Sequence, residues 1–217
     1  MLLVDASGSG AFGSREQPKR EVAAEIAALL AFSAIKNNDR IGLIIFTDQV
    51  EKFVPPKKGK KHVLALITEI LTFQPKSKRT DLRVGLEFLG KVARRRSVAF
   101  LVSDFIIDGG ALQYEKAMRI AKRKHDLVPV TITDPMEEEL PDVGYVYFED
   151  VETGEVVAFD TSGPGRARYS KAVRKQREER DQLFKRHSMD FVNVRTDQPY
   201  VAALVAFFRA RERRMRH

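Results

Sequence analysis

The chain has 217 residues, of which 43% are hydrophobic and 31% are charged, a composition that suits one globular domain with a sizeable core. It contains no cysteine, which excludes disulfides, zinc-thiolate sites and thiol catalysis. The formal net charge is +8, but the basic residues are spread over many short clusters without interleaved aromatic side chains. We interpret them mainly as a solvated surface, with a nucleic-acid-binding surface as the alternative.

The sequence contains no signal for a membrane span. No run reaches the roughly 18 to 20 apolar residues that a span requires, and the N-terminus lacks the pattern of a signal peptide. We therefore expect a soluble, cytoplasmic protein. The chain opens directly on the apolar stretch MLLVDAS, although native domains seldom begin inside a central strand. We expect residues 1–217 to form a single domain that lacks a native N-terminal region.

Strand and helix patterns alternate along most of the chain. We expect strands at 1–7, 40–47, 50–54, 97–104, 126–132 and 191–194, and helices at 18–36, 63–71, 81–94, 111–124, 169–187 and from 199 onward. The strands at 40–47 and 97–104 are nearly continuous apolar runs, as in strands buried on both faces. The pattern predicts an α/β fold: a doubly wound, mostly parallel sheet with helices on both faces.

The pattern changes after residue 134. The stretches VGYVYFED and EVVAFDT alternate between apolar and polar residues and are joined by VETG. They predict an antiparallel hairpin, inserted as residues 141–165. We interpret the preceding acidic run MEEE as a solvated loop, and Asp108 and Asp134 as turn residues.

Oxygen-bearing side chains gather after the ends of the predicted parallel strands. Asp5, Ser7 and Ser9 follow the first strand, Thr80 precedes a helix, and Asp104 ends the strand at 97–104. Ligands of open parallel sheets bind at the carboxyl ends of the strands. Mg²⁺ and Mn²⁺ prefer hard oxygen ligands, and Mg²⁺ takes about six of them. The spacing therefore predicts a divalent metal site with one coordination position open.

Other interpretations of the first loop fit its context less well. The glycines at 8, 10 and 13 match a dinucleotide fingerprint, but no helix opens at them and the ribose-binding acid is absent at the expected distance. A hydrolase with Ser9 as nucleophile is the enzyme alternative, yet Gly8-Ser9-Gly10 is not a nucleophile elbow. A plain capping turn is the remaining alternative. We expect a protein that is not an enzyme.

The motifs VDASGSG, RTDL and VSDF, in this order, resemble those of the von Willebrand factor A (VWA) domain. Longer stretches, among them AAEIAALLAFSAIKNNDRIGLIIFTDQVEKFVPPKKGKKHVL, look like a bacterial domain-of-unknown-function family of VWA-like proteins, typically encoded beside MoxR-type AAA+ ATPases. The resemblance implies a metal-ion-dependent adhesion site (MIDAS), with Mg²⁺ or Mn²⁺ held by Asp5, Ser7, Ser9, Thr80 and Asp104.

The resemblance also implies how such a module would work. An Asp or Glu of a protein partner, a MoxR-type ATPase or its client, would complete the coordination of the ion, so that the protein acts as an adaptor in chaperone-like assembly or maturation. Arg79 stands where the superfamily often has glycine. We expect Arg79, Asp81 and Phe105 to contact the partner, although Asp81 is better explained as a helix cap.

Overall fold

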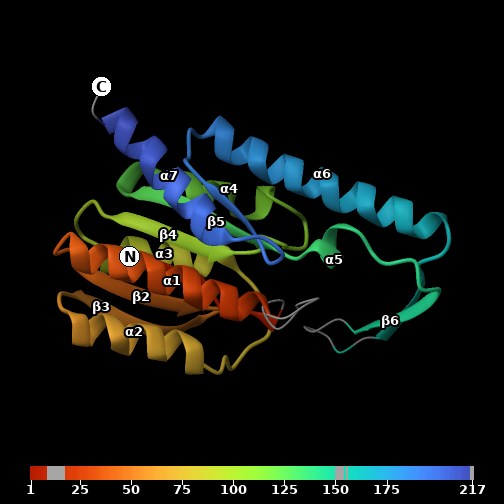
Figure 1. Ribbon diagram of the computed structural model, residues 1–217, viewed down its shortest axis with the longest axis horizontal. Helices are drawn as coiled ribbons and strands as arrows, with labels where there is room; N and C mark the ends of the chain where they lie inside the picture. The colour runs from red at the N-terminus through yellow and green to blue at the C-terminus, as the bar shows by residue number, and fades with distance from the viewer. Residues whose placement is uncertain (9–17, 150–153, 155, 216–217) are drawn as a thin grey trace.

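The computed structural model describes residues 1–8, 18–149, 154 and 156–215 (Figure 1). Its main sheet contains β1 (Leu2–Asp5), β2 (Ile41–Phe46), β3 (Val50–Lys57), β4 (Val98–Ser103), β5 (Asp126–Thr133) and β8 (Val192–Arg195). The spatial order is β3-β2-β1-β4-β5-β8, in which β2 and β3 pair antiparallel and the other described pairs are parallel. The α/β fold class expected from the sequence is thereby confirmed.

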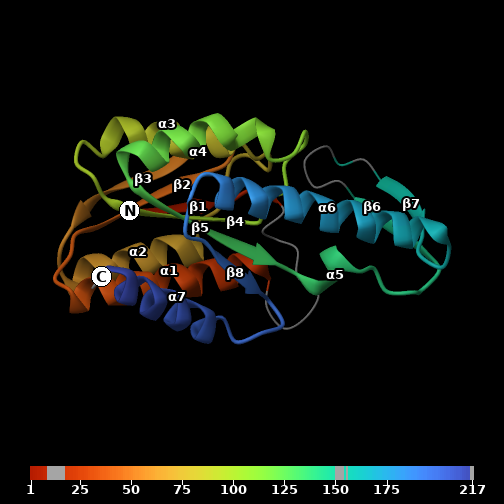
Figure 2. The same ribbon diagram turned by 90° about the horizontal axis from the view of Figure 1, so that it is seen from above.

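Helices cover both faces of this sheet, so that the molecule has three layers (Figure 2). One face carries α1 (Lys19–Lys36), α2 (Lys60–Thr72) and α7 (Tyr200–Met215); the other carries α3 (Leu82–Val92), α4 (Leu112–Lys124) and the C-terminal part of α6 (Pro164–Arg186). Because side chains alternate along a strand, Leu2 and Val4 pack on the α1 side while Leu3 packs on the α3 side. No helix in the described part of the chain could cross a membrane.

A short helix between β5 and the hairpin corrects one expectation. At the start of α5 (Pro135–Glu138), the side chain of Asp134 accepts a hydrogen bond from the N–H of Met136 at 2.9 Å, and the side chain of Glu137 accepts one from the N–H of Asp134 at 3.2 Å. This reciprocal pattern is a capping box, which holds the first turn in place. Three of the four residues of the MEEE run, 136–138, are therefore helical and fixed by contacts rather than part of a solvated loop, while Glu139 follows the helix and is exposed.

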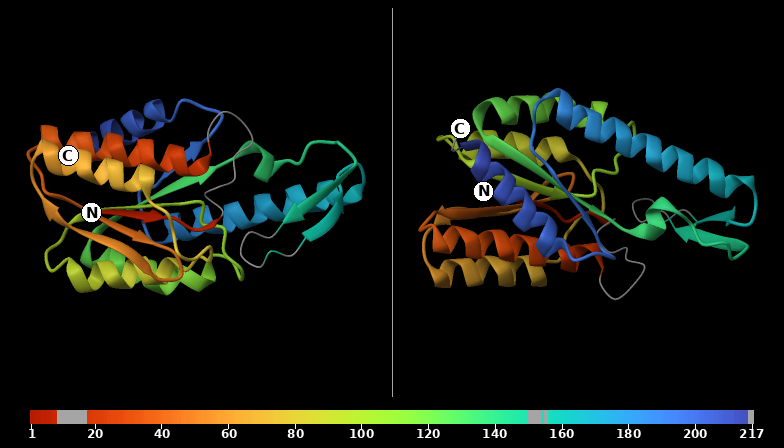
Figure 3. Two further views of the ribbon diagram at one scale, coloured as in Figure 1. Left: turned by 90° about the horizontal axis from the view of Figure 1, so that it is seen from below. Right: turned by 45° about the horizontal axis from the view of Figure 1, so that its top comes forward.

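The hairpin forms a small sheet of its own. β6 (Tyr145–Glu149) pairs antiparallel with β7 (Val156–Asp160), and the N–H of Thr161 donates to the carbonyl of Gly144 at 2.9 Å to close its base. It lies beyond the edge toward which the parallel strands point, beside the start of α6 (Figure 3). Helix α6 begins at Pro164, five residues earlier than residue 169, where we expected it to start, because proline is well suited to a first helical turn.

Candidate functional site

The carboxyl ends of β1 and β4 meet where the order of the sheet reverses. β1 pairs with β2 on one side and with β4 on the other, so successive crossovers leave this point in opposite directions. Asp5 is the last residue of β1, and Asp104 directly follows Ser103 at the end of β4. A reversal of this kind opens a crevice at the carboxyl edge of the sheet. The structure therefore brings two of the predicted metal ligands to one place.

The Asp5 carboxylate is held by hydrogen bonds to both oxygens. Oδ1 accepts from the N–H of Ser7 at 3.0 Å, and Oδ2 accepts from the hydroxyl of Ser103 at 2.7 Å. Burial and the negative charge of Asp104 raise the pKa of Asp5 to about 6, against the opposing effect of these hydrogen bonds. Because the charged form is disfavoured by its surroundings, a cation placed beside Asp5 would stabilise it.

Asp104 is paired with a buried lysine. Lys19, in the first turn of α1, is 3% exposed, and its Nζ donates to Oδ2 of Asp104 at 2.7 Å and to Oε1 of Glu137 at 2.5 Å. The other oxygen of Asp104 accepts from the N–H of Ile106 at 3.1 Å. Burial alone would lower the pKa of Lys19, but the two carboxylates raise it above its usual value. Lys19 is therefore a permanent cation at the end of β4.

The loop that carries Thr80 is tied to the first loop. The N–H of Gly8 donates to the carbonyl of Lys78 at 2.8 Å, and the N–H of Asp81 donates to the carbonyl of Thr47 at 3.2 Å. Thr80 is half-buried between these two tethers, and the side chain of Arg79 is exposed. Ser9, the remaining predicted ligand, lies outside the described residues.

Two of the residues expected to contact a partner have structural roles. Asp81 caps α3, accepting from the N–H of Arg83 at 2.9 Å and forming an ion pair with its guanidinium at 2.7 Å. Phe105 is 3% exposed and packs edge-on against Tyr114 and Phe184, with ring centroids 5.7 and 5.3 Å away. The expectation that Phe105 contacts a partner is corrected, because its side chain belongs to the core.

A small cavity at this edge tests whether the residues suit a metal ion. It measures about 20 Å³, and its lining includes Asp5, Ser7, Lys19, Ser103 and Asp104. That volume holds about one water molecule or a bare ion. Among the described residues no three His, Cys, Asp or Glu side chains converge as a metal group, so any ion here would depend on two carboxylates supplemented by hydroxyls. Such a set suits a hard divalent cation.

The charge balance of the cluster points the same way. Lys19 pairs with Asp104 and Glu137, the charge of Asp104 acts on Asp5, and Arg20 also lines the cavity. When all are ionised, three carboxylates and two basic side chains leave an excess of one negative charge. Unpaired buried charge is costly, so the cluster favours an added cation. We conclude that the residues present fit a divalent ion.

Three residues of this cluster were not predicted from the sequence. Ser103 directly precedes Asp104, and hydroxyls at strand ends were the pattern sought, so it could have been found. The D-x-x-E spacing from Asp134 to Glu137 signals a capping box and could have argued against a solvated loop. Nothing local marks Lys19 as the partner of Glu137, which lies 118 positions away.

The class of protein is a doubly wound α/β domain with carboxylates and hydroxyls at the switch point of its sheet. Residues 1–179 match the family model described as "Protein of unknown function DUF58", and the chain belongs to this family. It is 29% identical over 214 residues to an uncharacterized protein of Mycobacterium tuberculosis; the match covers 98% of this chain and 67% of that relative, so the chain spans about two thirds of its length.

Solved structures share the architecture at low sequence identity. The conserved hypothetical protein BatB from Bacteroides thetaiotaomicron matches with a TM-score of 0.62 and 14% identity, over 97% of this chain and 96% of that one. The SpRpn10 VWA domain matches with a TM-score of 0.46 and 15% identity, over 94% and 91% of the two chains. The likeness to BatB supports the fold described above.

Proposed function

We propose that the protein is a metal-dependent protein-binding module of the MIDAS type. The observation that carries the proposal is the meeting of Asp5, Ser7 and Asp104 around an ion-sized cavity at the switch point of the sheet. Thr80, on a loop tied to the first loop, and Ser9, which lies outside the described residues, are the proposed remaining ligands. A bound Mg²⁺ or Mn²⁺ would supply an electrophilic position for a carboxylate of the partner.

The protein's own residues would prepare that position. Ser103 and the N–H of Ser7 fix the carboxylate of Asp5, and Lys19 fixes that of Asp104, so neither side chain needs to be ordered when an ion arrives. Ordering costs free energy, and ligands held in advance bind more tightly. The buried surroundings also strengthen the attraction between an ion and an incoming carboxylate.

The resemblance to a family encoded beside MoxR-type AAA+ ATPases suggests the class of partner. We propose an adaptor that links such an ATPase to its client, without enzymatic activity of its own. The exposed Arg79 precedes Thr80 in the sequence and would donate a charge-assisted hydrogen bond to the partner carboxylate that binds the ion. The basic surface of the chain, with a net charge of +8, would steer acidic partners toward it.

Water-proton relaxation with Mn²⁺ tests this proposal. Mn²⁺ bound to the chain should enhance relaxation through a coordinated water, and a millimolar Asp-containing peptide should lower the enhancement by displacing that water. Thr80→Ala should weaken both effects, whereas Lys36→Ala, an exposed change at the far end of α1, should alter neither. No enhancement with the unmodified chain would contradict the proposal.

Binding to oligonucleotides tests the nucleic-acid alternative. Tight binding that does not depend on Mn²⁺ and whose affinity falls steeply with salt would favour that alternative.

A further inference from the structure

The first half of α6 carries an unusual excess of positive charge. Residues 164–177 contain six basic side chains and no acidic one: Arg166, Arg168, Lys171, Arg174, Lys175 and Arg177. The helix is preceded by Gly163, which provides no side-chain cap, and its first turn has no acidic residue. Basic residues near a helix N-terminus are repelled by the helix dipole and by one another. An anion bound along this half of the helix would relieve both repulsions.

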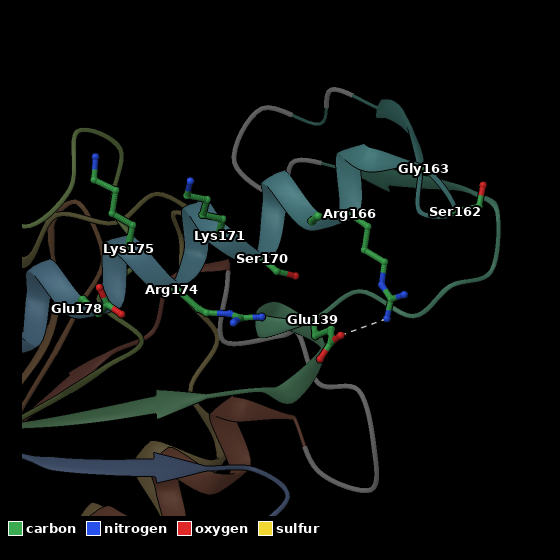
Figure 4. Close-up of a pocket in the computed structure, with 10 residues that line it drawn as sticks. Glu139, Ser162, Gly163, Arg166, Ser170, Lys171, Arg174, Lys175 and Glu178 are labelled. Carbon is green, nitrogen blue, oxygen red and sulfur yellow. Dashed lines mark hydrogen bonds and ion pairs between the residues drawn. The ribbon is translucent and has the colours of Figure 1, made fainter.

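A groove runs along this charged half of α6. Its volume is about 790 Å³, and Arg166, Ser170, Lys171, Arg174 and Lys175 are among its lining residues. In Figure 4, Arg166, Ser170 and Arg174 extend from α6 toward Glu139, whereas Lys171 and Lys175 extend to the opposite side of the helix. The groove is thus bordered by positive charge along two rows of the helix.

The wall of the groove next to α5 is fixed. Arg166 donates from Nε to the carbonyl of Leu140 at 2.6 Å and from Nη2 to Glu139 at 3.3 Å. These contacts join the start of α6 to the segment that follows α5. The groove is therefore preformed, which lowers the ordering cost of binding.

Two lining side chains have unused binding capacity. Ser170 is 6% exposed and forms no hydrogen bond with any described residue, although its side chain points toward the groove. Arg174, one turn further along, is exposed and has no ion pair within the described part of the chain. The hydroxyl oxygen of Ser170 stays within reach of solvent, and a ligand oxygen that accepts its hydrogen bond would replace water there.

We propose that this groove binds an acidic segment of a protein partner, with one carboxylate paired to Arg174 and one accepting a hydrogen bond from Ser170, while Lys171 and Lys175 attract the segment from the other side of the helix. Glu139 and Glu178 also line the groove, and none of its described lining residues is aromatic. Bases would find no aromatic stacking surface among these residues, which favours a peptide over a nucleic acid. The proposed groove site contains none of the proposed metal ligands, so peptide binding there does not depend on the metal-dependent function.

Fluorescence anisotropy with a labelled dodecapeptide of alternating Glu and Ser tests the proposal on the full chain. The charge reversal Lys171→Glu with Arg174→Glu should weaken binding about tenfold or more, because attraction becomes repulsion at two positions. Lys116→Glu with Arg119→Glu is the matched control: it reverses an exposed Lys and Arg, also three residues apart, on α4. This control should change the affinity less than about twofold, the effect of diffuse charge alone.

A neutral substitution separates a built site from general electrostatic attraction. Ser170→Ala keeps the net charge and should still weaken the peptide severalfold, and EDTA should leave all affinities unchanged. Equal losses in the two charge-reversal pairs, or an unchanged affinity of Ser170→Ala, would overturn the proposal. So would a uridine dodecanucleotide that binds more tightly than the peptide and loses affinity in the Lys171→Glu, Arg174→Glu chain.

Discussion

Lys19 connects the candidate metal site to the rest of the molecule. Its ammonium lies between Asp104 at the end of β4 and Glu137 in α5, where burial excludes water from all three groups. A buried pair adds little stability when compared with apolar residues, but removing one partner leaves an uncompensated charge. Lys19 is therefore required to keep two carboxylates in place, whether or not an ion is bound.

We predict that Lys19→Met lowers the free energy of unfolding by about 3 to 5 kcal/mol. Urea unfolding measures the change, and Lys36→Met, in the exposed last turn of the same helix, should cost less than about 0.5 kcal/mol. Mg²⁺ should stabilise Lys19→Met more than the unmodified chain, because more negative charge is then unpaired. Equal stability of the two variants would show that the ion pair is dispensable.

His125 provides a test of pH dependence away from the site. Its side chain is buried, and neither ring nitrogen has a hydrogen-bond partner among the described residues. Burial, together with the positive charges of Lys124, the N-terminus and Arg96, lowers the pKa of His125 below the usual 6.5. The unfolded chain therefore takes up a proton at a higher pH than the folded chain does. The stability contributed by neutral His125 is present above its pKa in the unfolded chain and is lost as the pH falls through its pKa in the folded chain.

We predict that His125→Leu reduces the loss of stability on acidification. Urea unfolding at about pH 7.5 and about pH 5.5 gives the difference for each chain, and the variant's difference should be the smaller. The two chains are compared by how much the free energy of unfolding changes between the two pH values. A change in packing that affects the free energy equally at both pH values therefore cancels. A difference as large as that of the unmodified chain would show that His125 does not protonate on unfolding.

At the scale of elements, two glycines of α3 show how the helix meets the sheet. A Cβ added at Gly85 would lie 2.7 Å from a ring carbon of Phe46, whereas one added at Gly90 would meet only the flexible Nζ of Lys124, at 3.8 Å. Both residues lie inside the same helix. Alanine raises helix propensity at either position, but only Gly85 is needed for close contact with β2.

We predict opposite signs for the two substitutions. Gly85→Ala should destabilise the protein by about 1 to 3 kcal/mol, because overpacking outweighs the gain in propensity. Gly90→Ala should stabilise it by up to about 1 kcal/mol. Thermal and urea unfolding of both variants check this, and stabilisation by Gly85→Ala would mean that α3 can move away from the sheet at little cost.

The elements that were predicted well are those with a local signal. Continuous apolar runs predicted β2 and β4, and alternation of apolar and polar residues predicted the hairpin of β6 and β7. These patterns are visible locally because the burial of each strand's faces determines which residue types follow one another along it. The start of α6 was misplaced because its first turns are charged and carry no apolar periodicity. The ion pairs of the MEEE run depend on distant segments and could not be predicted from the sequence: Glu137 pairs with Lys19, and Glu138 with Arg177 and Arg195. Only the capping-box spacing from Asp134 to Glu137 signals that this run is ordered.

The candidate site also contains features that the sequence predicts and features that it does not. Asp5 and Asp104 could be predicted because they end strands that any parallel sheet would bring to one edge. The burial of Phe105 could not, since it depends on Tyr114 and on Phe184 from a helix far along the chain. A residue next to a ligand in sequence is therefore not always on the surface next to it in space.

For the whole molecule, two apolar layers on opposite faces of the sheet provide the core, and the hairpin lies outside both. β6 and β7 pair with each other and not with a described strand of the main sheet. Cores of this size contribute most of the hydrophobic stabilisation, so the domain should not depend on the hairpin.

We predict that replacing residues 145–160 by a short Gly-Ser linker leaves the domain folded, with a loss of less than about 2 kcal/mol. The main cost should be the ring contact of Phe159 with Tyr169, whose centroids are 6.3 Å apart. Near-ultraviolet circular dichroism and urea unfolding measure the outcome. Loss of cooperative unfolding would show instead that the hairpin is an integral part of the fold.

The central claim is that the edge formed by β1 and β4 binds a divalent ion. Calorimetric titration of MgCl₂ and MnCl₂ into the chain and into Asp5→Ala tests it most directly, with circular dichroism to verify that the variant is folded. The account predicts saturable binding of one ion to the unmodified chain and none to Asp5→Ala. No binding to the unmodified chain, or equal binding to both, would contradict it.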